Sequence, residues 1–123
     1  MTATPTIHTV RLGPLDTNCH VLSDGGDCWV VDPSLQTDPL LRLLDERNLV
    51  PTHVVLTHGH GDHIAGIAAL RERWSVEVIA PEGDAEMLRD PEKNLSRLWG
   101  LEIDVGRPER TVRPGDELRL GET

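Results

Sequence analysis

The sequence predicts an α/β domain with a mixed β-sheet whose helices cover one face. Three observations support this fold class. The chain begins with short strand-like runs, it then alternates helical and apolar strand patterns, and a histidine-rich loop directly follows one of these strands. A length of 123 residues fits one small domain, which we assign to residues 1–123.

The opening third of the chain has the pattern of three short strands. Gly25-Gly26 separates the last two of them, and a two-residue glycine turn is typical of an antiparallel hairpin. We therefore expect an antiparallel start to the sheet, with strands over residues 6–12, 18–23 and 27–31.

Helices and strands alternate in the remaining sequence. Asp38 is expected to cap a helix that runs to Arg47, with Pro39 at its first position. Three apolar residues in the later helical stretches, Leu95, Leu98 and Trp99, could belong to the core or line a pocket, and we favour the core. The further elements are strands over residues 52–57, 76–80 and 117–120 and helical stretches over 62–73, 82–89 and 94–99.

Four side chains suited to metal binding stand close together after the strand that ends at residue 57: His58, His60, Asp62 and His63. Imidazole and carboxylate are the ligands that zinc and similar divalent cations prefer. An alternative is that Asp62 only caps the next helix while the histidines face water. One capping role leaves three histidines without a cause, so the pattern favours a metal site.

Local geometry also favours convergence of these ligands. His58 and His60 are two residues apart, so an extended backbone directs their side chains to one side. Gly59 and Gly61 permit a sharp turn with close approach of other groups. The loop follows a strand and precedes a helix, which is where open α/β sheets place their sites.

Composition excludes several classes of partner. A formal net charge of −9 argues against binding to nucleic acid and gives no attraction to anionic membranes. No apolar run is long enough to span a bilayer. Cys19 and Cys28 are interpreted as reduced, buried thiols because no secretory signal precedes them, so we expect a cytoplasmic protein.

The motif His58-x-His60-x-Asp62-His63 after a Val-Val-Leu-Thr strand resembles the metal motif of the metallo-β-lactamase superfamily. Further stretches are similar to small glyoxalase II-like hydrolases, at residues 13–19, 29–33 and 91–96. The resemblance implies an αββα sandwich, of which this chain supplies the N-terminal αβ half. It also implies two divalent metal ions, with zinc preferred over iron or manganese: His58 and His60 bind the first, Asp62 and His63 the second. Asp32 would lie beside them and orient a ligand.

The same resemblance implies hydrolysis of a small-molecule ester or thioester, such as an acyl-glutathione, by metal-activated hydroxide. Asp62 would act in catalysis by orienting the hydroxide as well as holding the second metal.

Complete members of this superfamily carry further ligands in a second half, including a His-x-Pro-Gly-His-Thr stretch, and this sequence has none after His63. We therefore expect a domain truncated before its C-terminal half. Two alternatives stay open. One is a catalytically incomplete half-domain that binds metal and pairs with itself as a homodimer or with a complementing C-terminal half. The other is a mononuclear iron persulfide dioxygenase, because related enzymes reuse this loop.

Overall fold

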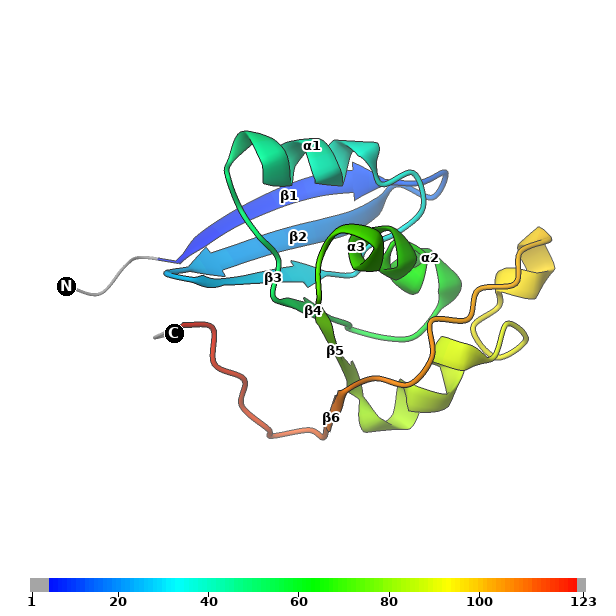
Figure 1. Ribbon diagram of the computed structural model, residues 1–123. Coiled ribbons are helices and arrows are strands. Elements are labelled where there is room, and N and C mark those ends of the chain that lie inside the picture. The colour runs from blue at the N-terminus through cyan, green and yellow to red at the C-terminus, as the bar shows by residue number, and fades with distance from the viewer. Residues whose placement is uncertain (1–4, 122–123) are drawn as a thin grey trace.

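The computed structural model describes residues 5–121 (Figure 1). Within these residues a single six-stranded sheet forms, with its strands side by side in chain order. The first three strands pair antiparallel and the later ones pair parallel, so the predicted mixed sheet is confirmed. The strands are β1 (Thr6–Leu12), β2 (Thr17–Asp24), β3 (Asp27–Val31), β4 (His53–Val55), β5 (Glu77–Pro81) and β6 (Arg110–Val112).

The predicted hairpin between β2 and β3 is confirmed. Asp24 pairs with Asp27, which leaves Gly25 and Gly26 as a two-residue turn. Gly25 has a φ of 62°, in the left-handed region where glycine carries no side-chain penalty. The glycine pair thus sets the antiparallel register of the opening strands.

A row of valines forms the centre of the core. Val21, Val30, Val54 and Val78 are paired in register across β2, β3, β4 and β5, and each is 0% exposed. Parallel strands covered by helices are typically rich in such β-branched residues. The helices α1 (Asp38–Glu46), α2 (Gly61–Ile64) and α3 (Ile67–Arg73) lie on this face of the sheet (Figure 1), as predicted.

The start of α1 differs from the prediction. Thr37, rather than Asp38, occupies the N-cap position, and its side chain makes no capping hydrogen bond. Pro39 nevertheless lies in the first turn, where its missing N–H leaves no helical hydrogen bond unmade. Leu40 and Leu44 are fully buried on the inner side of this helix.

The long helix predicted over 62–73 is interrupted at Ala65 and Gly66, and this prediction was wrong. The backbone N–H of Gly66 donates to the carbonyl of Pro33 at 3.0 Å instead of extending the helical ladder. A Cβ at this position would lie 2.7 Å from the carbonyl oxygen of Ser34, so only glycine allows this approach. A long-range backbone contact therefore ends α2 after one turn.

Two 3₁₀ segments, η1 (Glu82–Arg89) and η2 (Ser96–Trp99), follow β5. The preference for a core role of Leu95, Leu98 and Trp99 is wrong, because they are 38%, 78% and 43% exposed. The alternative of a pocket role is confirmed for Trp99, which lines a cavity. Polar Asn94 and Ser96 take the buried positions instead, at 0% exposure.

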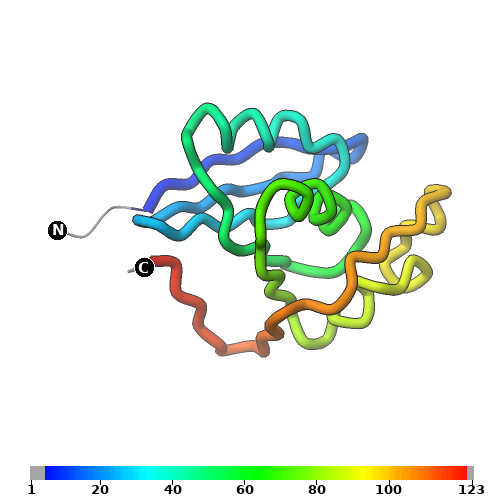
Figure 2. The backbone as a smooth tube through the Cα atoms, in the orientation of Figure 1, coloured from blue at the N-terminus to red at the C-terminus, as the bar shows by residue number. Residues whose placement is uncertain are grey.

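The end of the chain also differs from the prediction. No strand forms over residues 117–120, and the short β6 was missed because its exposed residues lack an apolar alternation. Figure 2 shows the segment after β6 returning toward the first strands. There the N–H of Gly121 donates to Oδ2 of Asp27 at 2.7 Å.

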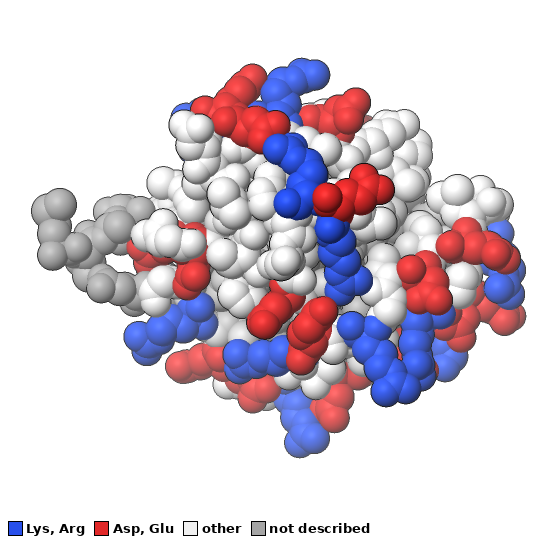
Figure 3. Space-filling model, in the orientation of Figure 1, with Lys and Arg blue, Asp and Glu red and all other residues white. Residues whose placement is uncertain are grey.

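Charged groups of both signs are interspersed over the face shown in Figure 3. The net negative charge is therefore not gathered into one patch on this face. Among residues 5–121, no helix has the length and apolar character needed to cross a membrane.

Candidate metal centre

The predicted ligands lie at the carboxyl end of the parallel part of the sheet. Asp32 directly follows β3, the loop from Leu56 to His60 follows β4, and η1 follows β5. Carboxyl ends of neighbouring parallel strands meet at one edge, so residues distant in sequence come together there.

Asp32 is buried beside this loop, at 5% exposure. Its Oδ1 accepts the backbone N–H of Thr57 at 2.9 Å. Its Oδ2 lies 2.9 Å from Nδ1 of His63 and also accepts the Thr57 hydroxyl. A φ of 56° at Asp32, which aspartate tolerates better than most residues, turns the chain sharply after β3.

These contacts determine which imidazole nitrogens carry protons. Because an ionised carboxylate only accepts, Nδ1 of His63 must donate to Asp32. The hydroxyl of Thr57 donates its one proton to Asp32. The Thr57 hydroxyl oxygen must therefore act as the acceptor for Nδ1 of His58, which lies 3.0 Å from it. One buried carboxylate thus sets the tautomer of both histidines and leaves each Nε2 with a free lone pair.

Asp62 and His63 present their donor atoms to a common point. Oδ2 of Asp62 lies 3.3 Å from Nε2 of His63. Two ligands held at about 2.0–2.1 Å by a tetrahedral cation are separated by roughly 3.3 Å, so this pair fits one divalent ion. That these two residues share a metal stays a prediction.

His60 and His58 are also brought together. Their ring centroids are 4.9 Å apart in an edge-on arrangement, and the centroids of His58 and His63 are 3.9 Å apart. Among the described residues, one group of three candidate ligands, Asp32, His58 and His63, has its donor atoms all within 4.8 Å of one another. Oδ2 of Asp32 already accepts two hydrogen bonds, so we assign Asp32 to orienting the histidines and not to holding the ion.

Partial burial of the cluster lowers the pKa of His58, with the nearby His63 adding to the effect. A lower pKa keeps the imidazole neutral at neutral pH, which is the form that binds a metal.

Two threonines that support the ligands were missed in the sequence. Thr17, 5% exposed at the start of β2, donates from its hydroxyl to Oδ2 of Asp62 at 3.1 Å. Thr57 links Asp32 to His58, as described above. Thr17 is 45 residues from Asp62, so no local spacing could have indicated it; Thr57 adjoins the motif and was read only as the end of a strand.

The segment that carries η1 and η2 forms hydrogen bonds to the loop of candidate ligands, residues 57–63. Oδ2 of Asp84 accepts the N–H of Gly59 at 2.9 Å, and the carbonyl of Asn94 accepts the N–H of Gly61 at 2.8 Å. A Cβ at Gly59 would lie 2.9 Å from Cβ of Met87, so the close approach expected of this glycine is present.

A family model covers nearly the whole chain. The description of this model is "Metallo-beta-lactamase superfamily", and it matches residues 12–123. The chain belongs to the metallo-beta-lactamase superfamily. Membership agrees with the mixed sheet and with the position of the histidine loop after β4.

Similar proteins in the superfamily support the narrower resemblance to glyoxalase II in part. The hydroxyacylglutathione hydrolase of Cereibacter sphaeroides (strain ATCC 17025 / ATH 2.4.3) is 39% identical over 87 residues, covering 71% of this chain and 33% of that protein. The chain spans about half the length of the curated relatives that it matches over most of its own length.

Two solved structures show the same fold. The BLEG-1 B3 metallo-beta-lactamase superposes with a TM-score of 0.83 and 28% identity, over 94% of this chain and 57% of that chain. TTHA1623, solved in a di-iron-bound form, gives a TM-score of 0.77 and 31% identity, over 90% of this chain and 56% of that chain.

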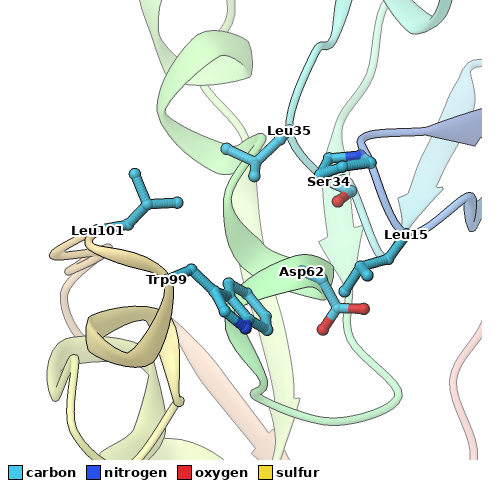
Figure 4. Close-up of a pocket in the computed structure, with 7 residues that line it drawn as sticks. Leu15, Ser34, Leu35, Asp62, Trp99 and Leu101 are labelled. Carbon is cyan, nitrogen blue, oxygen red and sulfur yellow. The ribbon is translucent and has the colours of Figure 1, made fainter.

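In this superfamily member a cavity of about 250 Å³ opens beside the candidate metal centre. Trp99 of η2 faces Asp62 of α2 across it, as Figure 4 shows. Apolar side chains dominate the wall. The residues labelled in the figure are Leu15, Ser34, Leu35, Asp62, Trp99 and Leu101.

Proposed function

We propose that this chain carries the metal-binding half of a metal-dependent hydrolase that acts on an ester or thioester. The observation that carries the proposal is the 3.3 Å separation of Asp62 Oδ2 and His63 Nε2, which fits one divalent ion. Its donor set of imidazoles and one carboxylate suits zinc and also iron or manganese. The di-iron form of TTHA1623 supports iron as an alternative to zinc.

Divalent ions bound here would lower the pKa of a coordinated water and polarise the substrate carbonyl. The chain's own residues prepare the site for this chemistry. Asp32 and Thr57 hold Nδ1 of both histidines, so that Nε2 faces the ligand position. Thr17 fixes Oδ2 of Asp62, the group that we assign to orienting the nucleophile. A small-molecule thioester is the proposed substrate, by analogy with the hydroxyacylglutathione hydrolases.

Metal binding and hydrolysis can be tested separately on the 123-residue chain. Titration with zinc, manganese or ferrous iron should show binding that His58→Ala and Asp62→Ala each weaken strongly. His8→Ala is the matched control, because His8 lies in β1 and belongs to no part of the centre. Equal affinities in all four proteins would overturn the metal site.

Hydrolysis of a neutral thioester by the loaded chain should then exceed the rate of the Asp62→Ala variant. Absence of turnover with intact metal binding would contradict activity of this chain by itself. Oxygen consumption with a persulfide by the iron-loaded chain would redirect the assignment to a dioxygenase.

A second candidate function is a self-associating or complementing module. The face of the sheet away from the helices carries Leu22, Trp29, Val31 and Val55, all partly exposed. Apolar sheet faces are usually covered, so a second copy or another chain would fit here. Measurement of the molecular mass in solution tests this candidate. A folded monomer at high protein concentration would exclude pairing with a second copy.

A further inference from the structure

The cavity beside Asp62 has a chemistry different from that of the metal centre. Its wall joins the turn after β1, the segment after β3 and the η2 region, and most of its lining is aliphatic or aromatic. Leu15 and Trp99 are 59% and 43% exposed, and both line this one cavity, so they form part of a shared apolar surface.

Asp62 belongs to both places. It lines the cavity, and its Oδ2 faces Nε2 of His63 in the candidate metal centre. A substrate whose carbonyl is held at the metal centre therefore has one of its substituents at the mouth of this cavity. A volume of about 250 Å³ lies below the roughly 300–1,000 Å³ of typical ligand pockets, so the cavity suits one substituent of a substrate.

We propose that this cavity binds an uncharged, apolar substituent next to the scissile carbonyl. The inference rests on the proposed hydrolase function and makes it specific. Among the described residues that line the cavity, Asp62 is the one ionisable group, so a buried carboxylate on the substrate would have no cationic partner there. The preferred substrates are short-chain acyl esters or thioesters, and a charged glutathionyl group lies outside this cavity.

Binding to the full chain without added metal tests the cavity independently of catalysis. The probes are N-acetylcysteamine thioesters with acyl groups from acetyl to pentanoyl, and the readout is the indole N–H resonance of Trp99. Affinity should rise by about two- to fourfold for each added methylene, as burial of CH₂ groups predicts. The succinyl thioester, which replaces the end of the pentanoyl chain by a carboxylate, should bind at least about tenfold more weakly.

A second series of thioesters keeps the acetyl group and lengthens the alkyl chain of the thiol. Comparison of the two series determines whether the acyl side or the thiol side of the substrate occupies the cavity. Chain-length dependence in either series supports the proposal. Its absence in both, or equal binding of the succinyl and pentanoyl thioesters, overturns it.

Variants assign the binding to the cavity wall. Leu15→Ala should weaken pentanoyl binding several-fold. Trp99→Phe, which lacks the indole reporter and is therefore measured by calorimetry, should retain most of the affinity. Leu98→Ala is the matched control, because Leu98 adjoins Trp99 in η2 but is 78% exposed and does not line the cavity. An equal loss in Leu15→Ala and Leu98→Ala would contradict the assignment. A chain that binds the probes but no metal would refute the proposed hydrolase and leave the cavity intact.

Discussion

Oδ2 of Asp32 lies 2.9 Å from Nδ1 of His63, and the same oxygen accepts the hydroxyl of Thr57. Through Thr57 this carboxylate also reaches Nδ1 of His58. A single buried group thus orients two candidate ligands that lie on opposite sides of the Gly59–Gly61 turn. Metal affinity should therefore depend on Asp32 although it does not hold the ion.

The first prediction concerns Asp32→Asn. The amide replaces an acceptor beside Nδ1 of His63 with a group that can also donate, so the required tautomer loses its support. Removal of such an orienting partner typically weakens metal binding by about 10- to 100-fold. Zinc titration monitored by a competing chelator measures the loss. Asp45→Asn, which changes an exposed carboxylate paired with Arg73, should retain the original affinity. Wild-type affinity in Asp32→Asn would refute the orienting role.

Thr17→Val tests the support of the second metal position. Valine keeps the shape of the side chain but removes the hydroxyl that donates to Oδ2 of Asp62 at 3.1 Å. We expect about tenfold weaker binding of one metal equivalent, with little change in the other, by analogy with other groups that orient ligands. Calorimetric titration resolves the two events. Thr111→Val in the exposed strand β6 is the control. If both metal equivalents weaken equally, Thr17 has a general structural role instead.

The proximity of the candidate ligands was predictable because they are local. His58, His60, Asp62 and His63 lie within six positions, and the structure places His60 beside His58, His58 beside His63 and His63 beside Asp62. Their binding of metal stays a prediction. The hairpin was also predictable, since Gly25-Gly26 determines the turn locally. Helix α2 was not, because its end depends on a bond from Gly66 to Pro33, more than thirty residues away.

The exposed side chains of η2 could not be predicted for a similar reason. Apolar Leu98 and Trp99 indicate core by composition alone, yet Asn94 and Ser96 take the buried positions. Asn94 can do so because its polar atoms find backbone partners from two other segments, Met87 and Ile103. Such partners are a property of the fold and leave no pattern in the sequence.

Asn94→Ala should destabilise the fold substantially. The Nδ2 group of Asn94 donates to the carbonyls of Met87 and Ile103, both at 2.8 Å, and its Oδ1 accepts the N–H of Ser96 at 3.0 Å. Alanine leaves the N–H of Ser96 and the carbonyl of Ile103 without these partners, while the carbonyl of Met87 still accepts the N–H of Asp90. Unsatisfied buried groups cost about 1–3 kcal/mol each, so the free energy of unfolding should fall by at least about 2 kcal/mol.

Urea unfolding measures this change, and Asn18→Ala at an exposed position of β2 is the control. Alanine keeps the backbone carbonyl that accepts the N–H of Gly61, so metal binding should weaken only through displacement of this segment when its side-chain bonds are lost. An unfolding free energy equal to that of Asn18→Ala would contradict the structural role of the side chain.

The last prediction concerns the two free cysteines. Cys19 and Cys28 are buried and unpaired, which confirms the expectation of two buried thiols, and they are not opposite each other because Cys19 pairs with Val10 and Cys28 with Ser23. Burial raises the pKa of Cys28 to about 11; burial, with a smaller contribution from Asp32, raises the pKa of Cys19 to about 12.

Raised pKa values have a defined effect on stability. Ionisation favours the unfolded chain, whose thiols titrate near 9, so the stabilising contribution is complete below that pH. It should be lost progressively as the pH rises from about 9 through about 11 and 12. Urea unfolding as a function of pH measures this loss, and replacement of Cys28 by alanine should reduce the slope.

Thiol reactivity provides an independent measurement. At about pH 8, a shift of two pKa units lowers the thiolate fraction about 100-fold, and burial restricts access further. Alkylation by iodoacetamide should therefore be at least about 100-fold slower in the native chain than in urea. Comparable alkylation rates in the two states would show that β2 and β3 separate readily from the rest of the fold. The end of β3, which positions Asp32, would then be mobile in solution.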